Sequence, residues 1–227
     1  MDDVSATRRT ALLAGATGLV GRALLPLLLA GKHYRGVHVL LRRAVPDIKA
    51  GPELKVHLVD FGMLPAAFPT VDDVFIALGT TIKAAGSEAA FRQVDFAFVV
   101  NTARAARAAG ARRLAVVSAL GANAKSRVFY NRVKGEMEAA IAQLGYECVV
   151  IARPSLLLGD RAALGQPVRS GEVWAARLFG PLRWMVPKGV RPIHVRAVAS
   201  ALLSAIPTAK PGVHVLKSGA MQANDEP

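Results

Sequence analysis

A glycine-rich turn near the start of the sequence constrains the fold more than any other feature. The stretch TALLAGATGLVGRALLPLLLAG (10–31) runs from a short apolar segment, through glycines spaced as G-x-x-G-x-x-G, into an apolar segment with helical periodicity. Strand, glycine turn and helix in this order are typical of dinucleotide-binding domains. Gly15 would make the tight turn, Gly18 would let the backbone approach a pyrophosphate, and Gly21 would let the helix pack closely on the strand. Thr17 could add a hydroxyl to the free amides at the helix N-terminus, which attract phosphate.

Two arginines ahead of this apolar run raise the alternative of a twin-arginine export signal. A signal is removed, so the mature fold must be complete without it. Removal of residues 1–30 would instead delete the first strand and helix, and Asp2 and Asp3 contradict a positively charged leader. We therefore interpret the segment as part of the fold, and we expect a cytoplasmic protein.

Strand-like and helix-like segments alternate along the chain as far as Pro154. The strand-like segments are apolar runs, which is typical of strands covered by helices on both faces. Their alternation with helices predicts an α/β fold with a parallel sheet and right-handed crossovers. We interpret the chain as one domain, with a cofactor-binding core at about 8–153 and substrate-side elements at about 154–227. The predicted strands are 10–15, 37–43, 55–61, 71–79, 112–120, 146–154 and a last one in GVHVLKS, and the later helices are 88–110, 129–145 and about 195–206.

Composition and charge exclude several classes of protein. The chain of 227 residues is 52% hydrophobic and has a formal net charge of +13, which favours anionic partners. The basic residues are scattered in pairs without a zinc-finger or RNA-recognition signature, so we do not expect a nucleic-acid partner. Cys148 is the single cysteine, which excludes an intramolecular disulfide and a Cys-based zinc site, and the histidines lack metal-ligand spacing. We therefore expect no bound metal. Arg22 interrupts the longest apolar run, so we expect no membrane span.

The end of the second predicted strand indicates which dinucleotide binds. An NAD site usually carries an acidic residue there, which accepts from the ribose 2′-hydroxyl. Here the predicted strand ends in Arg42 and Arg43, and the next carboxylate is Asp47. Two guanidinium groups suit a 2′-phosphate, so the sequence predicts NADP(H) in preference to NAD(H); the alternative is a pair of solvated charges. Asp60, near the end of the third predicted strand, would accept a hydrogen bond from the adenine amino group or cap a helix.

A tyrosine and a lysine four residues apart indicate proton chemistry. In YNRVK, Tyr130 and Lys134 share one face of the predicted helix. The ordinary pKa of a tyrosine phenol is about 10, and a nearby ammonium lowers such a pKa toward the range useful for general acid–base catalysis. Ser118 ends the fifth predicted strand, where a doubly wound sheet has its ligand crevice, and its hydroxyl could bind the same substrate oxygen. The alternative is a Tyr–Lys pair that only packs at the surface.

Together these motifs resemble the short-chain dehydrogenases/reductases. GATGLVG, then VVSALGA around Ser118, then Y-x-x-x-K, then ARPSLLLG occur in the order typical of that superfamily. VDFAFVVNTARAARAAG and RPIHVRAVASAL resemble segments of its extended and atypical branches, which include sugar-nucleotide epimerases and dehydratases. ALGTTIKAAGSEAAFRQVD and FYNRVKGEMEA are more similar to the Tat-interacting-protein branch. The resemblance covers about residues 10–217.

The resemblance implies a doubly wound parallel Rossmann sheet of about seven strands, a small C-terminal substrate-side lobe and a bound NADP(H) or NAD(H). It implies Ser118, Tyr130 and Lys134 as the catalytic trio, with Lys134 also holding the ribose hydroxyls. Arg196 departs from the family, which commonly has Asp there, and this argues against an epimerase-like substrate site. The other cofactor contacts that the resemblance implies are Gly15, Thr17, Gly18, Leu19, Val20, Arg42, Leu78, Gly79, Thr80, Pro154 and Ser155.

We therefore predict an NADP(H)-dependent oxidoreductase acting on a small carbonyl or alcohol. The alternative is an NADP(H)-binding regulatory or redox-sensing protein without turnover. Regulators of this superfamily tend to lose the tyrosine or the lysine, and this chain has both. The expected partner is a small-molecule substrate, and the oligomeric state is left open, with a homodimer as one option. Apolar residues of the tail would line a pocket, the core or a subunit interface: Trp174, Phe179, Trp184 and Met185.

Overall fold

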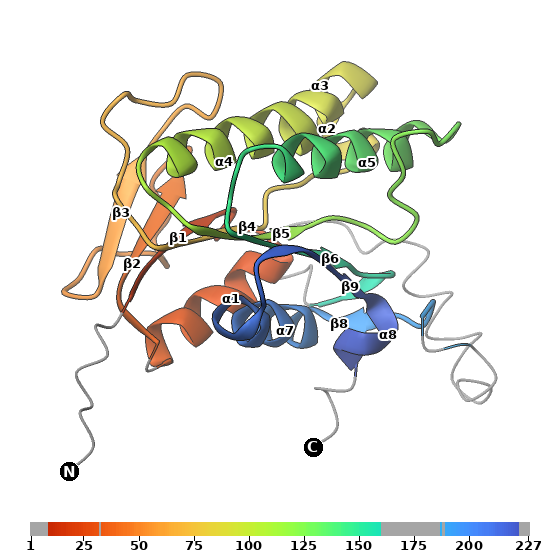
Figure 1. The fold of residues 1–227 in the computed structure, drawn as a ribbon. Helices are drawn as coiled ribbons and strands as arrows, with labels where there is room; N and C mark the ends of the chain where they lie inside the picture. The colour runs from red at the N-terminus through yellow and green to blue at the C-terminus, as the bar shows by residue number, and fades with distance from the viewer. Residues whose placement is uncertain (1–8, 32, 160–186, 188, 223–227) are drawn as a thin grey trace, which may run out of the picture.

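A parallel sheet of seven strands forms the centre of the molecule (Figure 1). The computed structural model describes residues 9–31, 33–159, 187 and 189–222. The strand order is β3-β2-β1-β4-β5-β6-β9, which is the order of doubly wound dinucleotide-binding sheets. The predicted fold class is therefore confirmed. The strands are β1 (Arg9–Ala14), β2 (Tyr34–Leu41), β3 (Leu54–Leu58), β4 (Asp73–Ile76), β5 (Arg113–Val117), β6 (Cys148–Arg153) and β9 (Gly212–Lys217).

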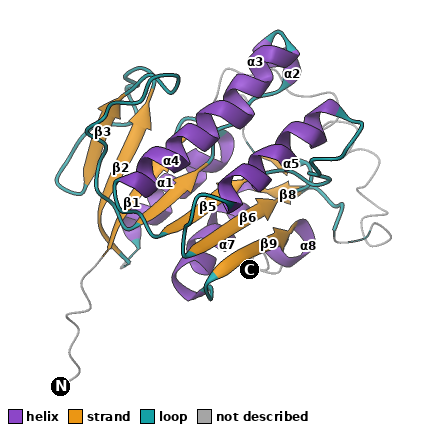
Figure 2. Ribbon diagram, turned by 45° about the horizontal axis from the view of Figure 1, so that its top comes forward, coloured by secondary structure: helices purple, strands orange, loops and turns teal. Residues whose placement is uncertain are grey.

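Helices cover both faces of the sheet (Figures 1 and 2). The helices are α1 (Leu19–Ala30), α2 (Ile82–Ala85), α3 (Glu88–Arg92), the π-helix η1 (Gln93–Phe98), α4 (Val99–Ala108), α5 (Phe129–Ala142), α7 (Val195–Thr208) and α8 (Ser218–Met221). On one face of the sheet lie α2, α3, α4 and α5, and on the other lie α1, α7 and α8. None of the helices in the described part of the chain is long and apolar enough to cross a membrane.

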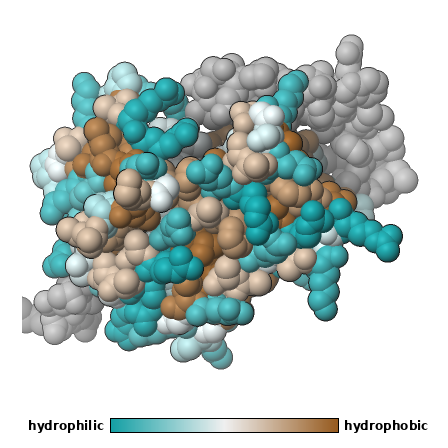
Figure 3. Space-filling view, turned by 90° about the horizontal axis from the view of Figure 1, so that it is seen from above, coloured by the Kyte–Doolittle hydropathy of each residue, from teal (hydrophilic) through white to brown (hydrophobic). Residues whose placement is uncertain are grey.

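Two apolar clusters fill the space between the sheet and its helices. Along β1, Ala11 and Leu13 belong to the cluster beneath α1 and α7, whereas Leu12 and Ala14 belong to the cluster beneath α4 and α5. Successive strand residues point to opposite faces, so both faces must be apolar, as the unbroken apolar runs predict. On the outer side of α4 and α5, hydrophobic patches are interrupted by hydrophilic side chains (Figure 3).

The helix predicted at 88–110 is divided into three segments. It begins as α3, continues through the π-helix η1, and ends as α4 ahead of Gly110, which has a φ of +103°. The sequence pattern did not predict the π-helix, because the apolar residues recur at helical spacing on both sides of it. A π-helical turn holds an extra residue, and such turns are frequent at functional sites.

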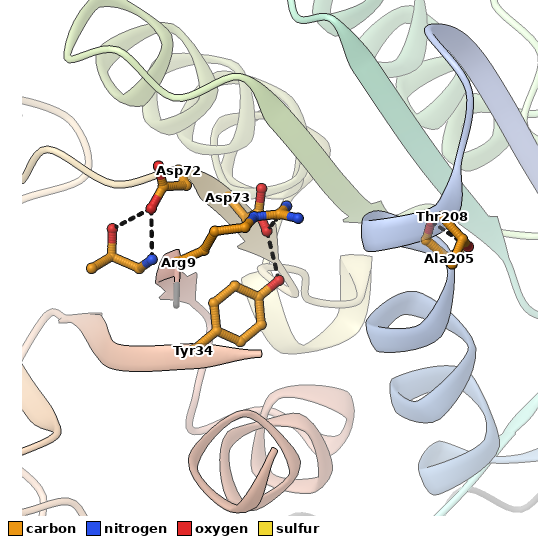
Figure 4. A network of polar contacts seen from close by, with 7 residues as sticks. Arg9, Tyr34, Asp72, Asp73, Ala205 and Thr208 are labelled. Carbon is orange, nitrogen blue, oxygen red and sulfur yellow. Dashed lines mark hydrogen bonds and ion pairs between the residues drawn. The ribbon is translucent and has the colours of Figure 1, made fainter. Parts of the chain in front are cut away.

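A buried polar network joins the amino ends of three strands (Figure 4). The Tyr34 hydroxyl donates to Oδ2 of the fully buried Asp73 at 2.7 Å, and the Arg9 guanidinium donates to the same oxygen. Burial raises the pKa of Asp73 even though these partners favour its carboxylate. Oδ2 of the neighbouring Asp72 accepts from the backbone and hydroxyl of Thr10. The network explains why β2 begins at Tyr34, three residues earlier than the apolar pattern predicts.

The described chain after β6 contains elements that its sequence predicted and others that it did not. The helix expected near 195–206 is α7, and the last expected strand is β9. The unexpected elements are a short parallel pair of β7 (Leu157–Leu158) and β8 (Ile193–His194), and the short helix α8. The apolar tail residues that would line a pocket, the core or a subunit interface lie outside the described residues: Trp174, Phe179, Trp184 and Met185. The division into a cofactor-binding core and substrate-side elements stays a prediction.

Candidate functional site

The glycine turn brings three elements into contact at the end of β1. Gly15 has a φ of +92°, and a Cβ there would lie 2.5 Å from the carbonyl carbon of Ala77, just after β4. A Cβ on Gly21 would lie 2.0 Å from the carbonyl oxygen of Gly15, so both positions require glycine for packing. A Cβ on Gly18 would meet the Gly15 oxygen at 3.4 Å, an ordinary contact. The protein itself therefore does not require glycine at Gly18, which fits the predicted approach of a ligand.

The N-terminus of α1 suits an anion. No side chain caps this helix, and its first internal bond runs from the Arg22 amide to the Gly18 carbonyl at 2.9 Å. The amides of Leu19, Val20 and Gly21 precede that bond at the positive end of the helix dipole. Thr17 is exposed beside them. These residues fit a pyrophosphate by the chemistry of their donors.

Ser118 is a buried hydroxyl without a protein partner. It follows β5, its backbone amide donates to the Ala152 carbonyl at 2.8 Å, and the residue is only 4% exposed. Its Oγ makes no hydrogen bond to any described residue. A buried polar atom of this kind costs stability unless a bound molecule satisfies it. Its place at the carboxyl ends of the strands is where doubly wound sheets bind ligands.

The structure brings Tyr130 and Lys134 to the same face of α5, as their spacing predicts. The ring of Tyr130 is half-buried and lies 5.3 Å from the Phe91 ring, centroid to centroid. Lys134 is 3% exposed, and its Nζ lies 2.8 Å from Oδ1 of Asp95, which is itself 1% exposed. Asp95 was missed by the sequence interpretation, because its partner lies on another helix far along the chain.

Lys134 remains an ammonium because of its carboxylate neighbours. Burial lowers the pKa of Lys134, but Asp95, Tyr130 and Glu138 together outweigh burial and raise that pKa above its ordinary value. Glu138 is shared with Arg153 at the end of β6, whose Nε donates to Oε1 at 3.0 Å and whose Nη2 donates to Oε2. The charge on Lys134 is therefore held by the protein before any ligand binds.

The segment after β4 meets the same cluster. The Thr80 amide donates to Oδ2 of Asp95 at 2.8 Å. A Cβ on Gly79 would lie 3.3 Å from Oδ1 of Asp95 and 3.8 Å from Nζ of Lys134. Gly79, Thr80 and Lys134, three of the predicted cofactor contacts, thus lie around one carboxylate, and Leu78 precedes them half-buried.

The predicted residues beyond this cluster have more varied surroundings. Arg42 and Arg43 are exposed after β2. Oδ1 of Asp60 accepts from the Gly62 amide at 2.7 Å within a turn, so the alternative of a helix cap is wrong. Pro154 is buried and accepts from the Leu120 amide at 2.8 Å. Ser155 donates to the Arg191 carbonyl and accepts from Ser218 at 2.9 Å, so its hydroxyl is already engaged within the protein.

A hollow of about 460 Å³ is bordered by α5, β6 and β9. Its lining includes Glu138, Arg153, Val213 and Val215, and none of Ser118, Tyr130 and Lys134. It meets the cluster around Asp95 at Glu138, which also acts on Lys134.

Comparison with known proteins defines the family. Residues 15–163 match the model of the NAD(P)H-binding family, and the chain belongs to this family. Protein HTATIP2 of Rattus norvegicus is 32% identical over 185 residues, covering 80% of this chain and 74% of its own. This match confirms the resemblance to the Tat-interacting-protein branch of atypical short-chain dehydrogenases/reductases. The protein therefore binds an NAD(P)-type nucleotide.

Other relatives correct one expectation and support the fold. Protein FMP52, mitochondrial, of Eremothecium gossypii is 38% identical over 152 residues, covering 66% of this chain and 67% of its own. Since FMP52 of Eremothecium gossypii and several of its namesakes are named mitochondrial, the expectation of a cytoplasmic protein is wrong. The enzyme WbmG of Bordetella bronchiseptica, solved in complex with NAD, matches with a TM-score of 0.67 at 17% identity, covering 99% of this chain and 78% of that one.

Proposed function

We propose that this protein is an NADP(H)-dependent oxidoreductase that moves hydride to or from a small carbonyl or alcohol. The observation that carries the proposal is the unpartnered, buried Oγ of Ser118 at the carboxyl edge of the sheet, in a family that binds NAD(P)H. A hydroxyl in this place is suited to a substrate oxygen. The half-buried Tyr130 and the charged Lys134 on α5 supply the remaining groups that such a reaction needs.

Each residue has a distinct part in binding. The amides at the start of α1, beside Gly15 and Gly18, hold the pyrophosphate. The guanidinium groups of Arg42 and Arg43 bind the 2′-phosphate, which is the reason to expect NADP(H). The ammonium of Lys134 binds the ribose hydroxyls.

The chemical step divides between two side chains. The nicotinamide, when bound, supplies or accepts the hydride at the substrate carbon. Ser118 donates a hydrogen bond to the substrate oxygen and fixes its position. Tyr130 gives a proton to that oxygen during reduction of a carbonyl, or takes one from it during oxidation of an alcohol.

Replacement of Tyr130 tests the proposal. We expect Tyr130→Phe to keep NADPH affinity within about twofold while lowering kcat at least about a hundredfold, since general acid–base catalysis contributes that much. Calorimetry measures the affinity, and a screen of small aldehydes and ketones finds the substrate. Tyr146→Phe is the control, because its hydroxyl bonds the Ala103 carbonyl at 2.6 Å, away from the cluster. Unchanged turnover in Tyr130→Phe would contradict the assigned role, and tight NADPH binding without any turnover would favour a regulatory or sensing protein.

A further inference from the structure

We propose that Asp95 is a positioning residue of the cofactor site, whose single carboxylate fixes both Lys134 and the segment after β4. The inference rests on the proposed function, because Lys134 is assigned there to the ribose hydroxyls of the cofactor. It adds a residue from η1, an element that the sequence interpretation did not connect with the site.

Both oxygens of Asp95 are engaged, each with a different element. Oδ1 lies 2.8 Å from Nζ of Lys134 on α5, and Oδ2 accepts from the Thr80 amide at 2.8 Å. Lys134 and Asp95 are almost completely buried, so solvent does not screen the pair. The carboxylate thus joins two segments on which a cofactor would lie, one carrying a charge and the other backbone groups.

The chemistry of this position requires a carboxylate. An ammonium and a backbone amide are both donors, and a carboxylate offers them two acceptors. Asparagine has the same shape, but its amide nitrogen would face one of these donors. Asp95→Asn therefore preserves packing and loses one of the two interactions, which makes it a sharper variant than a truncation.

Asp95 also controls the charge of Lys134. The groups that face Nζ are Asp95 from η1 and Tyr130 and Glu138 from α5, and Glu138 is already shared with Arg153. Burial alone lowers the pKa of Lys134, so loss of the Asp95 charge makes the ammonium easier to deprotonate. Removal of one member of a buried ion pair leaves the other charge uncompensated. In Asp95→Asn, any function that depends on the ammonium should weaken as pH rises.

The test measures the affinities for NADPH and NADH by calorimetry at pH 7 and pH 9. We expect Asp95→Asn to weaken binding at least about tenfold at pH 7 and further at pH 9. The matched control is Glu136→Gln, which breaks the Arg92–Glu136 ion pair between α3 and α5 near the surface. This control should bind both nucleotides like the wild type at either pH. Affinity in Asp95→Asn equal to the wild type at both pH values, with or without a lower melting temperature, would overturn the proposal.

A comparison of a double variant with Lys134→Met covers the case in which Asp95→Asn alone does not fold. Asp95→Asn combined with Lys134→Met removes both charges, and a buried pair removed together costs less than one partner removed alone. Without the ammonium, the asparagine oxygen can still accept from the Thr80 amide, so the double variant should bind cofactor as Lys134→Met does. A further loss of tenfold or more would overturn the proposal. Because these measurements read binding, absence of turnover in the wild type would contradict the oxidoreductase and leave the assignment of Asp95 intact.

Discussion

The Cα of Gly21 lies so near the carbonyl oxygen of Gly15 that a Cβ would stand 2.0 Å from it. No side chain can occupy that space without separating α1 from the end of β1. The same approach sets the direction of the uncapped helix N-terminus, so the packing of α1 and the proposed phosphate binding depend on one contact.

Gly21→Ala should therefore reduce both stability and cofactor affinity. Overpacking of this kind costs about 1–3 kcal/mol, and the displaced helix should weaken NADPH binding at least about tenfold. Urea unfolding and calorimetry measure the two effects. Gly51→Ala is the control, since a Cβ at Gly51 meets nothing within 4 Å. If Gly21→Ala and Gly51→Ala had the same stability and the same NADPH affinity, the close approach of Gly21 to Gly15 would control neither property.

Ser118→Ala should separate stability from activity. Its Oγ is buried without a partner among the described residues, so its removal should leave the free energy of unfolding unchanged or raise it by up to about 1 kcal/mol. Turnover should fall about a hundredfold if the hydroxyl binds the substrate oxygen. Ser87→Ala gives the opposite pattern, because the Ser87 hydroxyl accepts from the Ala90 amide at 3.1 Å and caps α3. That cap is worth about 1 kcal/mol and should not affect kcat.

Arg42→Ala combined with Arg43→Ala should change the choice of nucleotide. Loss of two charge-assisted contacts to a 2′-phosphate should weaken NADPH binding about tenfold to a hundredfold and leave NADH binding nearly unchanged. Arg35→Ala, an exposed arginine near the other end of β2, controls for the loss of positive charge. The argument for NADP(H) fails if the double variant loses the affinity for both nucleotides equally.

A histidine pair should make the stability depend on pH. Nδ1 of His38 on β2 lies 3.0 Å from Nε2 of His57 on β3, and burial, followed by neighbouring positive groups, lowers the pKa of both. As pH falls, the unfolded chain takes up protons from about pH 6.5, before the native pair does, so protonation stabilises the unfolded state relative to the native state. The stabilising contribution is thus present above that pH and is lost as pH falls through the lowered pKa values.

Urea unfolding at pH 7.5 and pH 5.5 tests this expectation. His57→Gln should make the free energy of unfolding depend less on pH than it does in the wild type. His214→Gln on β9 controls for the loss of one imidazole. If His57→Gln kept the full dependence of the wild type, the pair would not be its source.

The sequence contains most of the information needed for the sheet. Apolar runs identify β1, β5 and β6 within a few residues, because both faces of these strands are covered and most of their positions are apolar. The start of β2 was less predictable, since Tyr34 is held there by Asp73, a residue distant in sequence. Local patterns record burial and turns, and they do not record polar contacts between separate strands.

The site was predictable to a similar degree. Gly15 and Gly21 have packing roles that their spacing predicts, and Tyr130 and Lys134 share a helical face as expected. Asp95 was not predicted, because an acidic residue within an apolar helical pattern looks like an exposed position. Ser155 gave a different difficulty: its role as a cofactor contact stays a prediction from the motif, and only the fold reveals that its hydroxyl bonds Arg191 and Ser218.

The number of residues in the π-helix between α3 and α4 decides which side chains of this segment face α5. Each residue of a regular α-helix turns the next by about 100°, so one extra residue within Gln93–Phe98 changes which side chains face α5. Deletion of one residue there could leave a continuous helix with its apolar stripe realigned, while turning Asp95 away from Lys134. A one-residue deletion in this segment would therefore separate the buried ion pair even in a sequence that keeps both Asp95 and Lys134.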